Sequence, residues 1–217
     1  MIRPGAAYGT PASGPPELDV QGDDAALAAA VADRPGALVR FEPNGRSDLA
    51  RAVGLARPPA DNGATEVTID GLRTDESFAV NAVVLGTPPD QARVWARTFP
   101  VAVTVDGRDT FDGCAWCVLV ASGQYLRGLD VVPRGHPGDG QAEVQVYALA
   151  AGERGGLRRR LPQGTHVPHP RIRQTKGHRV EITVGGRARR LEIDGHRHPP
   201  RRHLRVEVIP GAARLLV

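Results

Sequence analysis

The chain has 217 residues, of which 41% are hydrophobic and 4% aromatic, so its core must be built mainly from Val, Leu and Ala. No apolar run approaches the roughly 18 residues of a membrane-spanning helix, and residues 1–16 lack the apolar centre of a secretory signal. We therefore expect a cytoplasmic protein with a flexible lead-in at residues 1–16.

Charge is divided along the chain. Residues 1–151 carry 12 Arg against 19 Asp and Glu, a net charge of −7, whereas residues 152–205 carry 15 Arg and Lys against 4 acidic residues, a net charge of +11. A basic C-terminal half suits an anionic partner such as a membrane surface or a nucleotide, and no motif that reads nucleic acid accompanies it. The competing interpretation is compositional drift, because 27 of the 28 basic residues are Arg.

Residues 17–63 have a β-α-β-α pattern. Strands are predicted at 17–20 and 37–41, and helices at 25–32 and 47–54. Asp23 or Asp24 is placed to cap the first helix, while Ser47 begins the second helix and Gly54 ends it. This alternation predicts a fragment of a parallel sheet, followed by a Pro-rich linker at 56–63.

Beyond the linker the pattern changes to short strands and turns. Strands are predicted at 66–70, 77–85, 101–105, 117–121, 143–149, 179–184, 189–193, 204–209 and 214–217. A helix is expected at 89–98, and Gly185-Gly186 is expected to form a hairpin turn. The predicted fold class is therefore α+β: a short β-α-β-α remnant at 17–63, followed by a larger, mainly antiparallel β-sandwich-like domain at 64–217.

Several motifs occur in an order that resembles one family. Gln21-Gly22-Asp23-Asp24-Ala25 stands where Gly-Gly-Asp-Gly-Thr would, and Pro43 to Arg51 follows Pro-x-Gly-Thr-x-Asn-Asp-x-Ala-Arg with one residue fewer. Further on come Asp139-Gly140 in a Gly- and Pro-rich loop, Gly164-x-His166, His169-Pro170-x-Ile172 and Asp194-Gly195-His196. Together these resemble the bacterial diacylglycerol kinases and related lipid kinases over roughly residues 18–217.

The resemblance implies phosphoryl transfer from ATP, with Mg²⁺, to a lipid hydroxyl. Asp194 would be the catalytic base and Asp139 the carboxylate on the metal side. The residues implied to bind the nucleotide are Gly22, Asp23, Gly45 and Arg46. From the residues alone, an ordinary hairpin turn is the favoured interpretation of Asp194-Gly195, and an ordinary turn cap is the favoured interpretation of Asp139.

Departures from the family pattern bear on activity. Gln21 and Asp24 replace two glycines of the phosphate loop, and His196 replaces an acidic neighbour of Asp194. The family's first βαβ portion has no counterpart ahead of residue 18. The expectation is therefore a weakly active or inactive lipid kinase-like protein, with a non-catalytic lipid- or partner-binding protein as the alternative. In the kinase interpretation another chain would complete the cleft, and a homodimer is a separate expectation for the partners.

Histidine and arginine clusters carry two further interpretations. His166-x-x-His169 and His196-x-His198 with His203 invite a zinc site, but prolines interrupt them and Cys or Glu partners are missing. The Arg158–Arg160 cluster is expected to be a solvated loop, or else a patch that holds a peripheral protein at an anionic membrane.

Overall fold

The computed structural model describes residues 9–55, 65–75 and 77–217. The first eight residues of the predicted lead-in and the linker at 56–63 lie outside these ranges. Within the described part of the lead-in, β1 (Thr10–Pro11) pairs antiparallel with β4 (Thr65–Thr74). The Ser13 hydroxyl donates a hydrogen bond of 2.9 Å to Glu66. This part of the lead-in is thus paired with the sheet, which corrects the expectation that it is flexible.

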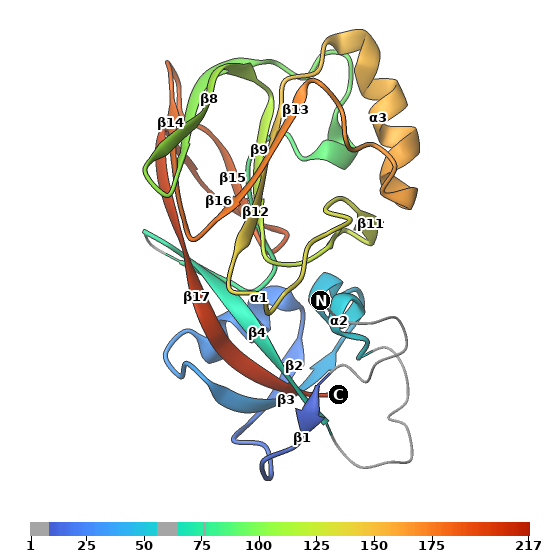
Figure 1. The fold of residues 1–217 in the computed structure, drawn as a ribbon, viewed down its shortest axis with the longest axis vertical. Coiled ribbons are helices and arrows are strands. Elements are labelled where there is room, and N and C mark those ends of the chain that lie inside the picture. The colour runs from blue at the N-terminus through green and yellow to red at the C-terminus, as the bar shows by residue number, and fades with distance from the viewer. Residues whose placement is uncertain (1–8, 56–64, 76) are drawn as a thin grey trace.

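Two sheets build most of the molecule (Figure 1). The first has nine strands: β1, β2 (Leu18–Gly22), β3 (Ala37–Pro43), β4, β5 (Phe78–Ala79), β7 (Phe99–Val105), β8 (Arg108–Ala115), β14 (Arg179–Val184) and β17 (His203–Leu216). The second, in the order β13-β12-β9-β6-β15-β16, has β6 (Ala82–Gly86), β9 (Cys117–Ala121), β12 (Ala142–Tyr147), β13 (Ile172–Gly177), β15 (Arg189–Ile193) and β16 (His196–Arg201). A small separate ribbon contains β10 (Tyr125–Leu126) and β11 (Leu129–Asp130).

The two sheets face each other across an aliphatic core in the upper lobe of the view in Figure 1. Inward-facing residues alternate along the strands, as in β7, where Val101, Val103 and Val105 are buried. All pairs in the second sheet are antiparallel. The predicted α+β class with a mainly antiparallel β-sandwich is confirmed.

A single long strand, β17, joins the sandwich to the lower lobe (Figure 1). On one side of β17, the first half pairs antiparallel with β14 and the second half pairs in parallel with β3. On the opposite side, β4 pairs antiparallel with both halves of β17. A bulge at residues 210–212 separates the halves. There Asp70 accepts hydrogen bonds from the backbone N–H groups of Gly211 (3.0 Å) and Gly140 (2.6 Å).

The lower lobe carries helices α1 (Asp24–Val31) and α2 (Asp48–Val53) against β2, β3, β4 and β17. Strands β2 and β3 are parallel, as the alternating pattern predicts. Asp23 caps α1 by accepting from the Ala26 N–H at 3.0 Å. Ser47 caps α2 in the same way, and Gly54 ends it in the left-handed conformation.

A third helix, α3 (Arg154–Arg160), is flanked by the short 3₁₀ turns η2 (Ala151–Glu153) and η3 (Leu161–Gln163). It lies over the outer face of the second sheet, where Leu157 and Leu161 are buried with Trp116 and Tyr147. The expected loop at Arg158–Arg160 is therefore helical, because buried leucines anchor its inner face while the arginines remain exposed.

Three other expectations are wrong. The predicted helix at 89–98 is only a 3₁₀ turn, η1 (Pro89–Gln91). The predicted strand at 77–85 is divided into β5 and β6 by residues 80–81. Gly185-Gly186 does not close a hairpin, because β14 belongs to the first sheet and β15 to the second.

Candidate functional site

A cavity of about 230 Å³ lies where the starts of α1 and α2 meet two turns of the sandwich. Its lining is unusually rich in charge for so small a space. The residues are Asp23, Asp24, Arg46, Asp48, Asn81, Leu126, Arg127, Asp194, Gly195 and His196. Of the predicted site residues, the structure brings Asp23, Arg46 and Asp194 together here.

Asp194 occupies the tight turn between β15 and β16 with a φ of 44°, followed by Gly195 at 83°. The side chain is 8% exposed and receives three backbone N–H groups. Asn81 and Ala82 donate to Oδ1 at 3.0 and 2.8 Å, and Val80 donates to Oδ2 at 2.8 Å. These bonds use the N–H groups between β5 and β6, which explains why the predicted strand at 77–85 is interrupted.

Burial raises the pKa of Asp194 to about 7, and the nearby Asp24 adds to this, while the three backbone donors act in the opposite direction. An ionised carboxylate offers about four lone-pair positions, so three donors leave one free. Asp194 is therefore both the hairpin residue and a candidate base that exchanges a proton near neutral pH.

Asp23 and His196 face each other across the cavity, with 2.7 Å between Asp23 Oδ2 and His196 Nε2. The hydrogen bond from His196, followed by that from Ala26, lowers the pKa of Asp23. Gly22, just before Asp23, has a φ of 144°, and a Cβ there would lie 2.6 Å from the Cβ of Ala26. Glycine is thus required for β2 to turn into α1 at this point.

Asp24 is buried and reaches across to the start of α2. The Ser47 hydroxyl donates a short hydrogen bond to its Oδ1, and the N–H groups of Asp48 and Leu49 donate to Oδ2 at 3.1 and 3.3 Å. Burial raises the pKa of this carboxyl, and the hydrogen bonds of Ser47 and the two N–H groups oppose that shift. The residue that replaces a glycine of the family pattern is therefore the N-terminal anchor of α2.

Asp48 uses its carboxylate to hold the turn between β10 and β11. The Gly128 N–H donates to Oδ1 at 2.6 Å, and the Arg127 N–H makes a short bond to Oδ2. Nearby, Arg46 and Arg51 donate to the carbonyls of Arg127 and Gly128 at 3.0 and 2.6 Å. The start of α2 and the β10–β11 turn are therefore tied together by charged side chains from the α2 side that bind backbone N–H and carbonyl groups of the turn.

The guanidinium of Arg127 is held by two acidic side chains. It lies 2.9 Å from Asp90 and makes a closer ion pair with Glu192, which is 1% exposed and is also paired with Arg190 at 2.7 Å. Sequence reasoning did not identify Arg127, Asp90 or Glu192 as parts of the site. The only local signal was Arg127-Gly128 on a tight turn, which says nothing about distant partners.

The other three predicted residues, Gly22, Gly45 and Asp139, do not line the cavity. Gly45 has a φ of 106° in the turn before Arg46 and does not line the cavity. Asp139 accepts from the Gln141 N–H at 3.0 Å and from Lys176 at 3.2 Å. Within the described residues, no group of three or more His, Cys, Asp or Glu side chains is placed to hold a metal ion. The role of Asp139 on the metal side stays a prediction.

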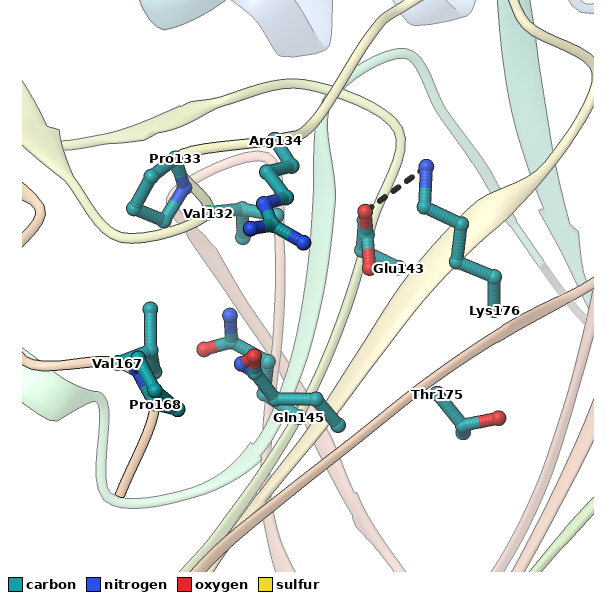
Figure 2. Close-up of a pocket in the computed structure, with 10 residues that line it drawn as sticks. Val132, Pro133, Arg134, Glu143, Gln145, Val167, Pro168, Thr175 and Lys176 are labelled. Atoms are coloured by element: carbon teal, nitrogen blue, oxygen red, sulfur yellow. Dashed lines mark ion pairs between the residues drawn. The ribbon is translucent and has the colours of Figure 1, made fainter.

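A second, larger hollow of about 410 Å³ lies on the outer face of β12 and β13. Figure 2 shows the side chains that line it. The loops at 132–134 and 167–168 form its other wall. Glu143 and Lys176 pair across its edge at 2.9 Å, and Lys176 also contacts Asp139. Amide and apolar side chains make up much of the remaining lining: Val132, Pro133, Gln145, Val167, Pro168 and Gln174. Arg134 on the loop wall is exposed and also lines this hollow, so a cationic side chain stands beside the ion pairs of Lys176.

The molecule is thus a two-sheet sandwich joined to an α/β lobe, with a charged cavity at the junction. The chain belongs to the family described as the YegS C-terminal NAD kinase beta sandwich-like domain, whose model matches residues 91–217. No curated protein has a sequence that matches the chain.

Solved structures share this fold over most of the chain. A protein of Bacillus anthracis str. Sterne assigned as a diacylglycerol kinase has a TM-score of 0.73 at 16% identity, covering 92% of this chain and 78% of that one. A second diacylglycerol kinase structure from the same organism has a TM-score of 0.69 at 17% identity, with coverages of 92% and 76%. Yeast NADH kinase complexed with NADH has a TM-score of 0.55 at 12% identity, and the match covers 93% of this chain and 61% of the yeast chain. These likenesses establish the kinase-like fold.

Proposed function

We propose that this chain is a diacylglycerol kinase-like phosphotransferase of low activity, in which the cavity at the lobe junction takes nucleotide phosphates and Asp194 is the base. The observation that carries the proposal is Asp194 itself. It is a nearly buried carboxylate with a pKa raised to about 7 by burial, fixed by three N–H donors, on the wall of a cavity that also contains Arg46.

The chemistry assigned to the base is a single proton transfer. The O–H bond of an alcohol acceptor breaks and its proton passes to the free lone pair of Asp194. The acceptor oxygen bonds to the γ-phosphorus of ATP as the bond from that phosphorus to the ADP oxygen breaks. A base with a pKa near the working pH is suited to this step, because it is partly ionised yet still strong enough to accept the proton.

Low activity follows from the charges around the cavity. Four aspartates line it against two arginines, so the formal charge of these side chains is −2 when all four carboxylates are ionised. Moreover, Arg127 is already paired with Asp90 and Glu192, which leaves Arg46 as the principal partner for a phosphate. A polyphosphate therefore meets net repulsion here.

The metal in this proposal arrives with the nucleotide. The described side chains offer no group of three ligands, and Asp139 is paired with Lys176. When bound, Mg²⁺ would offset the charge of the nucleotide phosphates. Asp23 and Asp194, which line the cavity, would be the carboxylates that face the bound Mg²⁺ complex. ATP without a divalent cation should therefore bind much less well than its Mg²⁺ complex.

Calorimetry with Mg²⁺–ATP tests the nucleotide site. We expect saturable binding with a Kd of about 100 µM or weaker, reduced about 10-fold by Arg46→Gln because one charged contact to phosphate is lost. Arg40→Gln is the matched control, since Arg40 is exposed on β3 outside the cavity. Equal affinities for the wild type and Arg46→Gln would remove the cavity as the phosphate site.

Phosphoryl transfer is tested separately with labelled ATP and a panel of diacylglycerol-like alcohols. Asp194→Ala should lower transfer by about 100-fold or more, because the positioned base is removed. Transfer that is the same for the wild type and Asp194→Ala would refute the assigned role of the base.

The alternative function is a non-catalytic lipid- or partner-binding protein with the same fold. It is favoured by the internal use of the cavity's carboxylates, since Asp24 and Asp48 anchor backbone N–H groups and Asp23 pairs with His196. A flat titration with Mg²⁺–ATP together with no transfer to any alcohol would select this alternative.

A further inference from the structure

The loop at residues 92–98, which we term the Trp95 loop, presents apolar side chains to solvent. Val94 is 58% exposed and Trp95 is 71% exposed. Among the residues that the structure describes, these are the only large apolar side chains classed as exposed. Because the two are adjacent in the chain, they form one apolar tip on a surface that is otherwise polar.

A buried arginine holds this loop in place. Arg154, the first residue of α3, is 3% exposed and donates from Nη1 to the carbonyls of Arg93, Val94 and Ala96 at 3.0, 3.2 and 2.7 Å. Its guanidinium also lies 5.5 Å from the centre of the Trp116 ring. Two of these carbonyls, those of Arg93 and Val94, are ones that the expected helix at 89–98 would have used internally. The three bonds also tie the loop with the exposed tryptophan to α3.

The surroundings of the tip are positively charged. Arg93 and Arg97 lie in the Trp95 loop, and the Arg93 guanidinium sits 5.4 Å from the Trp95 ring centre. Arg158, Arg159 and Arg160 are exposed on α3. Neither 92–98 nor 154–160 contains an acidic residue. The acidic residues next to these segments are engaged elsewhere, since Asp90 pairs with Arg127 and Glu153 contacts Arg171.

We infer that the Trp95 loop and α3 together form a docking surface for an anionic lipid bilayer. Trp95 and Val94 would enter the interfacial region of the bilayer, where tryptophan is favoured, while the five arginines contact the lipid headgroups. No described helix is long and apolar enough to cross a membrane. The proposed attachment is peripheral and does not depend on nucleotide binding or phosphoryl transfer.

The size and shape of the surface favour a bilayer over a protein. A specific protein interface buries about 800 Å² on each partner around an apolar core, whereas only two large apolar side chains are exposed here. A single protruding tryptophan within a field of arginines instead matches the chemistry of an anionic headgroup layer. Binding of an acidic protein to this surface, in place of a bilayer, would therefore overturn the proposal.

The test uses the fact that the chain has two tryptophans. Trp116 is fully buried, so a change in fluorescence on adding vesicles reports on Trp95. With vesicles of 70% phosphatidylcholine and 30% phosphatidylserine in 0.1 M salt, we expect a blue shift and co-sedimentation of the full chain. Binding should weaken strongly at 0.5 M salt, because attraction between exposed charges is screened.

Variants separate the apolar and the charged contributions. Trp95→Ala should reduce vesicle partitioning by about 10-fold, and Arg158→Gln/Arg159→Gln/Arg160→Gln by on the order of 100-fold, since each basic side chain contributes about fivefold. The matched control is Arg40→Gln/Arg73→Gln/Arg205→Gln, which removes the same charge from exposed positions on β3, β4 and β17. This control should bind within about twofold of the wild type.

Three results would overturn the inference. The first is no binding of the wild type to the anionic vesicles. The second is an equal loss in the α3 variant and the control, which would mean that only net charge matters. The third is a blue shift with an acidic peptide but none with vesicles, which would assign the surface to a protein. Calorimetry with Mg²⁺–ATP on the same variants should be unchanged, so failure here is distinct from failure of the nucleotide site.

Discussion

At the scale of single residues, the four aspartates of the cavity differ in what they bind. Asp23 makes an exposed pair with His196, and its pKa is lowered, first by that hydrogen bond. Asp24 and Asp194 are buried, and burial raises the pKa of each. Because only Asp194 combines burial, a fixed orientation and a pKa near 7, it is the one carboxylate suited to exchange a proton at neutral pH.

A dependence of stability on pH follows for Asp194. Its pKa is about 7 in the folded protein against an ordinary value of 3.8, so the folded state binds the proton more tightly. The resulting stabilisation is complete below pH 3.8, is lost as the pH rises through 7, and amounts to about 4 kcal/mol. Asp194→Asn should flatten the fall in unfolding free energy over this range, as measured by urea unfolding at several pH values.

The control for this prediction is Asp33→Asn, an exposed acidic residue after α1. It should leave the pH dependence as in the wild type. If Asp194→Asn and the wild type lost stability in parallel between pH 4 and 7, Asp194 would not titrate as assigned.

At the scale of elements, α2 is a six-residue helix, too short to be stable by its own hydrogen bonds. It is held by Ser47 at its start, by Asp24 from α1, and by the contact of Asp48 with the β10–β11 turn. The buried carboxylate of Asp24 therefore has a structural use, because it anchors the start of α2.

Replacing that anchor should have a large effect. Asp24→Ala leaves Ser47 and the N–H groups at the start of α2 without their acceptor, so we expect a loss of about 2–3 kcal/mol of unfolding free energy. Denaturant unfolding measures it, with Asp33→Ala as the control that should cost less than about 0.5 kcal/mol. A cost for Asp24→Ala equal to that of the control would contradict the anchoring role.

At the scale of the whole molecule, β17 and β4 carry the chain through both lobes (Figure 1). Leu215 is buried in the lower lobe beside the helices, whereas Leu204 and Val206 of the same strand are buried between the two sheets. Because β17 contributes buried side chains to both cores, loss of packing in one core destabilises the other core as well. The predicted boundary between segments 17–63 and 64–217 remains a prediction, although β3 of the first segment pairs with β17 of the second.

Cooperative unfolding of the two lobes is the corresponding prediction. Leu215→Ala should lower the unfolding free energy by about 2–5 kcal/mol, and the loss should be visible in the fluorescence of Trp116 in the other lobe. Glu42→Ala, exposed on β3, is the control. A Trp116 transition that stays in place while circular dichroism detects earlier unfolding of the helices would show that the lobes unfold separately.

Local features were readable from the sequence by itself. Signals within a few residues predict Ser47 and Gly54 at the ends of α2 and the parallel pairing of β2 with β3. They also predict a cap of α1 at Asp23 or Asp24, of which the structure uses Asp23. The mainly antiparallel pairing of the strands at 64–217 follows from the alternation of apolar and polar residues along short strands. Such signals suffice because capping and amphipathic alternation depend only on neighbouring residues.

Only the tertiary structure decided which distant groups meet. The sequence Gly185-Gly186 is compatible with a hairpin within one sheet and with a connection between two sheets. The structure has the second arrangement, because β14 and β15 belong to different sheets. The acceptors of the N–H groups at 80–82 lie 112 to 114 residues away in Asp194, and the carbonyls at 93–96 are taken by Arg154. Partners separated by this much chain are chosen by packing of the whole fold, and no local pattern encodes that choice.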